Sequence, residues 1–422
     1  MVEPKFQTTQ PPSAPKSTHS AFNALYHRDF RLLWLGQIVS VTGSQMQSVA
    51  VNWHVYLLTK SALALGLVGL FKGAPIVLCS LIGGVVADVA DRRRLMILTQ
   101  SVMLISSALL TLVTLGGLRT VWPVYLLTGI AYGATAFDIP ARQALMPTLV
   151  PPRDFPNAVS LSLIVFNIAM IAGPSIAGFL LASTGPALVY GVNAASFLAV
   201  IVALLLMKTS GRVSMEAEHA TRVDLAALKE GLRFVWRTPI IVQTMTLDFA
   251  ATFFASATAL LPIFAQEILS VGARGLGLLA AAPAVGSVIT GLVMARLGHF
   301  RRQGALVIGS VGVFGLATIA FGLSRVFWFS LCMLALSGAA DTVSTILRQT
   351  IRQLATPNHL RGRMTSINMV FFMGGPQLGE LEAGLLASFV GAPLSVVVGG
   401  VGSLASALIA AVKSRTLRRY DQ

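Results

Sequence analysis

Polar side chains recur at helical spacing inside two long apolar stretches of this sequence. The eight residues concerned are Gln37, Ser40, Ser44 and Gln47 in the first stretch, and Thr244, Asp248, Thr252 and Ser256 in the second. Polar groups within a membrane are costly, and by default they face a cavity or a partner. We therefore expect these two stripes to line a shared substrate cavity. The alternative is that they join neighbouring helices by hydrogen bonds.

Four ionisable residues also fall deep inside apolar stretches: Lys72, Asp341, Glu380 and Glu382. Glu380 and Glu382 lie roughly 200° apart around a helix, so both cannot face one cavity, and Glu380 is favoured. A buried carboxylate can switch its charge as its surroundings change, which a proton-coupled site requires. Asp248 and Glu380 are therefore predicted to couple protons, with Lys72 in the cavity as a counter-charge. The alternative is a static ion pair.

These residues must be positioned by membrane-spanning helices. The chain is 55% hydrophobic and 11% charged, whereas soluble domains carry roughly 25% charged residues. A spanning helix needs about 20 apolar residues. Twelve such spans are predicted, at 30–57, 62–87, 95–116, 121–143, 156–183, 186–207, 239–266, 274–297, 303–323, 326–350, 363–390 and 393–412.

The basic residues show which side of the membrane each loop occupies. Of the 31 Lys and Arg residues, the loops on the side opposite the termini carry only Lys60, Arg119, Arg274 and Arg325. Lys and Arg accumulate in cytoplasmic loops, so both termini are predicted to be cytoplasmic. The charge of +15 is thereby explained by topology, and no nucleic-acid partner is expected.

A weak internal repeat divides the chain into two halves. A shift of 206 residues matches Gln37 with Gln243 and Arg142 with Arg348, and a shift of 208 matches Pro75 with Pro283. Two six-span halves with a site between them are a transporter architecture. The predicted organisation is a disordered tail (1–27), an N-terminal half (28–208), a cytoplasmic linker (209–238), a C-terminal half (239–413) and a short tail (414–422).

The loop between the second and third spans reads Gly83-Gly84-Val85-Val86-Ala87-Asp88-Val89-Ala90-Asp91-Arg92-Arg93-Arg94. It resembles the signature loop of the major facilitator superfamily, which implies an all-α fold of two pseudo-symmetric six-helix halves. By this resemblance Gly84, Asp88, Arg92 and Arg93 form a cytoplasmic gate. Val89 departs from the pattern, which has arginine there. The alternative is that the arginines only anchor topology.

Further motifs resemble one branch of that superfamily, which contains the bacterial enterobactin exporter and related efflux proteins. The resemblance rests on 137–147, 157–161, 348–350 and 360–363. Gly173, Pro174 and Gly178 partly match a glycine-proline pattern found in exporters of the superfamily, although Ala177 replaces a glycine. Proline frees a backbone carbonyl and permits bending. A hinge is one reading, and an inert packing kink is the other.

The sequence contains no GxxxxGK[ST] loop for ATP and no segment that could form a catalytic domain, so neither ATP, a cofactor nor enzymatic activity is expected. The resemblance implies a multi-pass protein of the bacterial inner membrane that exports a small organic molecule, such as a siderophore or a drug, by alternating access with proton antiport. The arginine that many proton antiporters carry in the middle of span 4 has no counterpart. The alternatives are an uptake symporter and a sensor that transports nothing.

Overall fold

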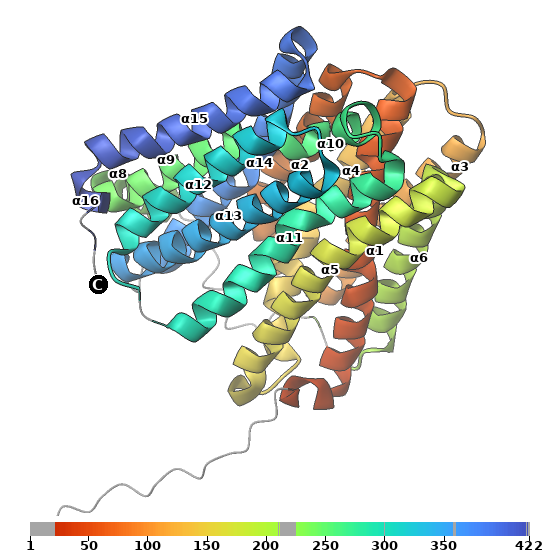
Figure 1. The fold of residues 1–422 in the computed structure, drawn as a ribbon. Coiled ribbons are helices and arrows are strands. Elements are labelled where there is room, and N and C mark those ends of the chain that lie inside the picture. Colours follow the sequence, from red (N-terminus) through yellow and green to blue (C-terminus); the bar gives the residue numbers. More distant parts are fainter. Residues whose placement is uncertain are drawn as a thin grey trace, which may run out of the picture.

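The chain folds into long helices, as the sequence predicts. The computed structural model describes residues 22–209, 211, 225–298, 300–357, 360–418 and 420, and within them there is no strand (Figure 1). The long helices are α1 (Arg28–Thr59), α2 (Ala62–Val89), α3 (Arg92–Leu115), α4 (Trp122–Leu145), α5 (Phe155–Thr184), α6 (Pro186–Leu206), α9 (Pro239–Phe254), α11 (Gly272–Leu297), α12 (Gln303–Leu323), α13 (Phe327–Ala355), α14 (Arg361–Val390) and α15 (Ala392–Lys413).

Shorter elements connect or flank these helices. They are η1 (Asn23–Tyr26), η2 (Met146–Thr148), η3 (Pro152–Asp154), α8 (Leu225–Arg237), η4 (Ala257–Leu260), α10 (Leu261–Ile263), the π-helical turn η5 (Phe264–Ile268) and α16 (Arg415–Arg418). Most of the predicted linker at 209–238, apart from α8, lies outside the described residues, and so does most of the predicted tail at 1–27. The end of that tail is ordered, because Ala24 is fully buried and its backbone N–H donates to Asn157 Oδ1 at 2.9 Å.

Local signals place the helix ends within a few residues of their predicted positions. Ser61 caps α2 by accepting a hydrogen bond from the Ala64 N–H, and Asp91 caps α3. Gly185 and Gly391 form the turns before α6 and α15 with φ of 79° and 85°, a region that favours glycine. These two glycines are separated by the same shift of 206 residues that relates the two halves in the sequence.

The predicted span 239–266 is not one continuous helix. α9 ends at Phe254, and the chain continues through η4, α10 and η5. Pro262 lies in the first turn of α10, more than one helical turn beyond Phe254, so it does not account for the end of α9. π-helical turns such as η5 are rare and are frequent at functional sites.

Nine helical segments of the described residues are long and apolar enough to cross a membrane. The predicted spans in α1, α4 and α14 are not among them. For these three helices the count of twelve spans stays a prediction.

The long helices form two groups that meet at one end. Helices α1–α6 pack mainly against one another, and so do α9 and α11–α15. Between the groups, α2 lies along α14 and α5 lies along α11 (Figure 1). A methyl group on Gly178 would lie 2.7 Å from Gly277 Cα, and one on Gly66 would lie 2.9 Å from Gly384 Cα. These contacts close the end of the molecule opposite the chain termini.

Candidate functional site

A cavity of about 660 Å³ lies within the N-terminal group of helices. It extends from Phe30 and Phe155, near the ends of α1 and α5 that adjoin the termini, to Lys72 and Thr128 in the middle of α2 and α4. Five of the predicted cavity residues line it: Gln37, Ser40, Ser44, Gln47 and Lys72. The cavity therefore lies on the side of the molecule where the two groups of helices do not touch.

The other five predicted residues do not line this cavity. They are Thr244, Asp248, Thr252, Ser256 and Glu380. Thr244 is fully buried, and Thr252 donates to the Asp248 carbonyl of α9. Ser256, which follows α9, donates to the carbonyls of Thr252 and of Pro376 in α14. Only the N-terminal stripe therefore lines this cavity, and the hydrogen bonds of Thr252 and Ser256 stay within the C-terminal half.

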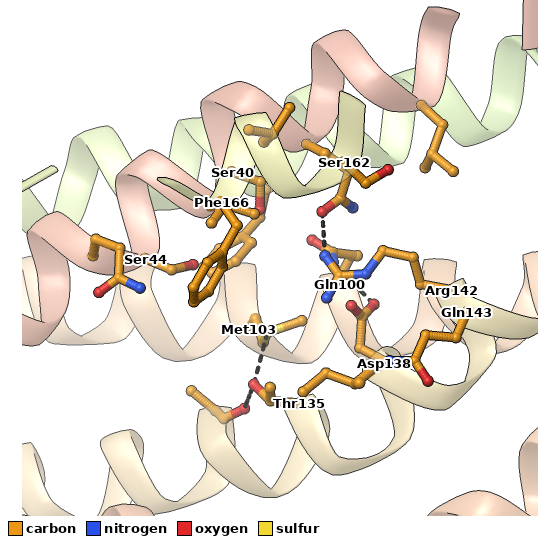
Figure 2. A pocket seen from close by; sticks show the side chains of 18 of the residues that line it. Ser40, Ser44, Gln100, Met103, Thr135, Asp138, Arg142, Gln143, Ser162 and Phe166 are labelled. Carbon is orange, nitrogen blue, oxygen red and sulfur yellow. Dashed lines mark hydrogen bonds between the residues drawn. The ribbon is translucent and has the colours of Figure 1, made fainter. Parts of the chain in front are cut away.

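α4 supplies two charged residues of the cavity, Asp138 and Arg142 (Figure 2). The Arg142 guanidinium donates to Gln37 Oε1 of α1. Asp138 lies one turn earlier, and its Oδ1 accepts hydrogen bonds from Thr99 and Gln100 of α3, both at 3.0 Å. Among the described residues Arg142 makes no ion pair, so its charge is available to the cavity.

Lys72 lies deeper in the same cavity and is 3% exposed. Its Nζ donates to Ser48 Oγ at 3.2 Å and to Asn52 Oδ1 at 3.5 Å, and it lies 5.9 Å from the centre of the Tyr132 ring. These partners are neutral, so Lys72 does not act as a counter-charge to Asp248 or Glu380 in this conformation.

Asp248 instead forms a buried ion-pair cluster with α13. Its Oδ1 lies 2.8 Å from Nη2 of Arg348, and its Oδ2 lies 3.6 Å from Nη1 of Arg352. Asp341 Oδ1 lies 3.7 Å from the same Arg348 nitrogen. Asp341, Arg348 and Arg352 share one face of α13, because residues seven and eleven positions apart return to the same side of a helix.

Glu380 lies on α14 where that helix packs against α2. It is 9% exposed, its Oε1 accepts a hydrogen bond from Thr258 at 3.2 Å, and its Oε2 has no partner among the described residues. Glu382 is only half-buried. The structure therefore separates the two carboxylates in the way that their spacing predicts.

The predicted gate is described only in part. The surroundings of Gly84 and the side chain of Asp88 lie outside what the structure describes. Arg92 donates to the Ala144 carbonyl at 3.0 Å, and Arg93 donates to the Leu205 carbonyl at 3.1 Å. Both arginines thus bind carbonyls near the C-terminal ends of α4 and α6, where a positive charge is favourable. All of these contacts lie within the N-terminal group of helices.

Gly173, Pro174 and Gly178 lie where α5 contacts two other helices. A methyl group on Gly173 would lie 2.5 Å from Gln45 Cβ of α1. On the α11 side, a methyl group on Gly277 would lie 2.5 Å from the Pro174 carbonyl oxygen and 2.8 Å from Gly178 Cα. These positions therefore permit close packing, whether or not they also bend.

The sequence analysis missed the site roles of Arg142, Arg348 and Arg352, because arginines near helix ends were interpreted as topology anchors. A signal was available. Arg142 and Arg348 are paired by the 206-residue repeat, and each contacts the first helix of its own half, at Gln37 and Asp248 respectively. An arginine that occupies the equivalent position in both halves is better explained by a contact inside each half than by membrane topology alone.

Two solved structures that resemble this one come from transporter families. One is a bacterial homologue of the human lysosomal transporter Spinster in an inward-facing, unoccupied conformation, with a TM-score of 0.74 at 15% identity, covering 94% of this chain and 98% of that one. Another is a POT family transporter in complex with a thioalcohol-conjugated peptide, with a TM-score of 0.71 at 13% identity, covering 92% and 96%. At these identities the likeness concerns the fold alone.

Sequence comparison identifies the family. The family described as "Transmembrane secretion effector" matches residues 19–422. The chain is 28% identical over 398 residues to the enterobactin exporter EntS of Citrobacter koseri and 27% identical to that of Escherichia coli O1:K1, each time covering 94% of both chains. The chain therefore belongs to the transmembrane secretion effector family of the major facilitator superfamily, as a multi-pass, exporter-type secondary transporter of the bacterial inner membrane and not an enzyme.

Proposed function

We propose that this protein exports a small organic molecule, of the siderophore or drug type, by alternating access and in exchange for protons. The observation that carries the proposal is the cavity of about 660 Å³ that reaches from the terminus-bearing side to Lys72, while α2–α14 and α5–α11 contacts close the opposite end. A substrate would enter this cavity from the side of the termini.

The direction of export depends on which side that is. The excess of Lys and Arg in the loops beside the termini supports a cytoplasmic location for both termini. In this orientation the cavity faces the cytoplasm, where an exported substrate must bind. The enterobactin exporters that cover 94% of this chain support the same direction.

Two six-helix halves, 28–208 and 239–413, would rock about the closed end to carry the substrate across. Gly173, Pro174 and Gly178 would serve as the pivot, because they lie where α5 approaches α1 and α11 most closely. Gly84, Asp88, Arg92 and Arg93 would close the cytoplasmic end in the other state. The two carboxylates available for proton exchange would be Asp248 and Glu380, which are 4% and 9% exposed.

The test is transport by the purified protein in proteoliposomes, with a panel of siderophores, macrolides and dyes. Alternating-access proton antiport predicts that an imposed proton gradient drives one class of compound in the direction opposite to proton flow, and that an uncoupler abolishes this movement. Movement in the same direction as protons would establish uptake instead. Binding without flux would contradict transport altogether.

A further inference from the structure

Glu380 lies in the tightest part of the contact between the two halves. Along this seam, α2 presents three glycines to α14: a methyl group on Gly66 would meet Gly384, one on Gly69 would meet Glu380 Cβ at 2.6 Å, and one on Gly73 would meet Gln377 Cβ at 2.6 Å. The glycines are three and four residues apart and thus share one face of α2. The Glu380 side chain is therefore enclosed whenever this seam is closed.

The enclosed carboxyl group has little to stabilise a negative charge. Thr258 of η4 donates one hydrogen bond to Oε1 at 3.2 Å, Oε2 has no partner among the described residues, and no ion pair reaches either oxygen. The charged residue of α2 nearest along that helix is Lys72, whose Nζ is directed to Ser48 and Asn52 of α1. On α14, Glu382 is also acidic, and η4 and the middle of α15 carry no charged residue.

The carboxylate of Asp248, in the same half, has different surroundings from that of Glu380. That carboxylate is equally buried, but two arginines lie within 4 Å of it. Burying an unpaired carboxylate is strongly unfavourable, and the usual escape is to bind a proton. Of the two candidate coupling groups, Asp248 thus lies beside two cations in this conformation, whereas Glu380 is enclosed with no cation paired to it among the described residues.

We propose that closure of the α2–α14 seam requires a proton on Glu380. When the end opposite the termini is open, the Glu380 carboxylate takes a proton from the water on that side and becomes a neutral acid. The neutral side chain can then be enclosed between Gly69 and Thr258. The importance of this closure for transport rests on the proposed function. In that cycle, proton uptake by Glu380 outside would allow the cavity to open again toward the termini.

The experiment measures the seam directly and needs no substrate. Arg119 and Arg325 are exposed in the loops that follow α3 and α12, one in each half at the seam end. Replacing both by spin-labelled cysteines, in protein whose Cys79 and Cys332 are changed to alanine, gives a distance that lengthens when the seam opens. The distance is recorded from acidic to alkaline pH in nanodiscs.

In the labelled parent protein, which keeps Glu380, the distance between the two labels is expected to lengthen as the pH rises, because Glu380 then loses its proton. Glu380→Gln, which mimics the protonated acid in shape and charge, is expected to stay closed at every pH. Glu382→Gln is the matched control, two residues away on a half-buried face of the same helix, and is expected to open like the parent. Glu380→Ala, which also lacks the charge, should likewise lose the pH response even if its packing is looser.

The proposal is overturned if the parent distance does not respond to pH, if Glu380→Gln keeps the parent response, or if Glu382→Gln loses it. Failure of the proposed function would appear elsewhere, as absence of flux in proteoliposomes. The two results are independent, because the distance is measured without any transported compound.

Discussion

Arg348 binds Asp248 through a single nitrogen, Nη2, at 2.8 Å from the carboxylate Oδ1. The same nitrogen lies 3.0 Å from Thr345 Oγ1 and 3.7 Å from Asp341 Oδ1, while Nε and Nη1 of Arg348 have no hydrogen-bond partner among the described residues. A buried guanidinium, here with a side chain only 1% exposed, normally uses more of its five donors. Arg348 therefore has spare capacity for another acceptor within the C-terminal half.

Replacing Asp248 by asparagine should both destabilise the protein and abolish proton-driven export. The change leaves Arg348 and Arg352 buried without their shared anion, and breaking a buried ion pair costs roughly 3–5 kcal/mol. Thermal unfolding in detergent and flux at several pH values would measure the two effects. Asp341→Asn is the control, since its side chain is 45% exposed and should matter less for stability. Unchanged proton-driven flux and pH dependence in Asp248→Asn would exclude Asp248 from coupling.

Removing the Tyr56 hydroxyl should favour opening of the end opposite the termini. This hydroxyl donates to Glu267 Oε1 of η5 at 2.7 Å, and the bond joins the two halves. A hydrogen bond to a charged group contributes about 1.5 kcal/mol or more, so Tyr56→Phe should shift the equilibrium roughly tenfold. The spin labels at 119 and 325 would report it. Tyr190→Phe removes a hydroxyl that bonds only within the N-terminal half, and an equal shift there would contradict a specific latch.

A larger side chain at Gly277 should prevent the closed end from forming. Valine there would place its Cβ 2.5 Å from the Pro174 carbonyl oxygen, which is backbone and cannot move aside easily. Gly277→Val should therefore lose most export, at least tenfold, while it still inserts into the membrane. Gly291 on the same helix has nothing within 4 Å, so Gly291→Val should transport normally. Equal flux from both variants would show that close approach at Gly277 is dispensable.

Much of the architecture follows from the sequence, because apolar length and the distribution of basic residues are properties of single segments. The start of α2 and the ends of α5 and α14 were thus predicted to within a residue. The break after Phe254 was not, since the stretch before Pro262 is as apolar as an unbroken span. The site was predicted less completely. Gln37 and Lys72, which line the cavity, were predicted because polar groups in a bilayer stand out, whereas Arg348 was used as evidence for the internal repeat and was not predicted as a site residue.

The tilt of the two halves relative to each other is not encoded in the pattern of any single helix. Thr252 and Ser256 have the spacing of a cavity stripe, yet neither lines the cavity, and the Ser256 hydroxyl donates to the Pro376 carbonyl of α14. Which of two equally polar stripes faces open space depends on how the two halves are tilted, and that tilt is set by contacts between distant segments such as Gly66 and Gly384. The spacing of polar residues describes each helix separately and does not show which of the two stripes faces open space.

Arg142 is expected to contribute directly to substrate binding. Its guanidinium lines the cavity and, among the described residues, bonds to the neutral Gln37 and to no carboxylate, so its charge is available to an acceptor on the substrate. Losing one charge-assisted hydrogen bond costs about 1.5–3 kcal/mol, so Arg142→Ala should raise the KM for export at least tenfold. Arg142→Lys should restore part of the affinity, since it keeps the charge but not the planar fork. Arg153, exposed in η3, is the control: if Arg153→Ala weakened export as much as Arg142→Ala, a general effect of positive charge at this end would explain both.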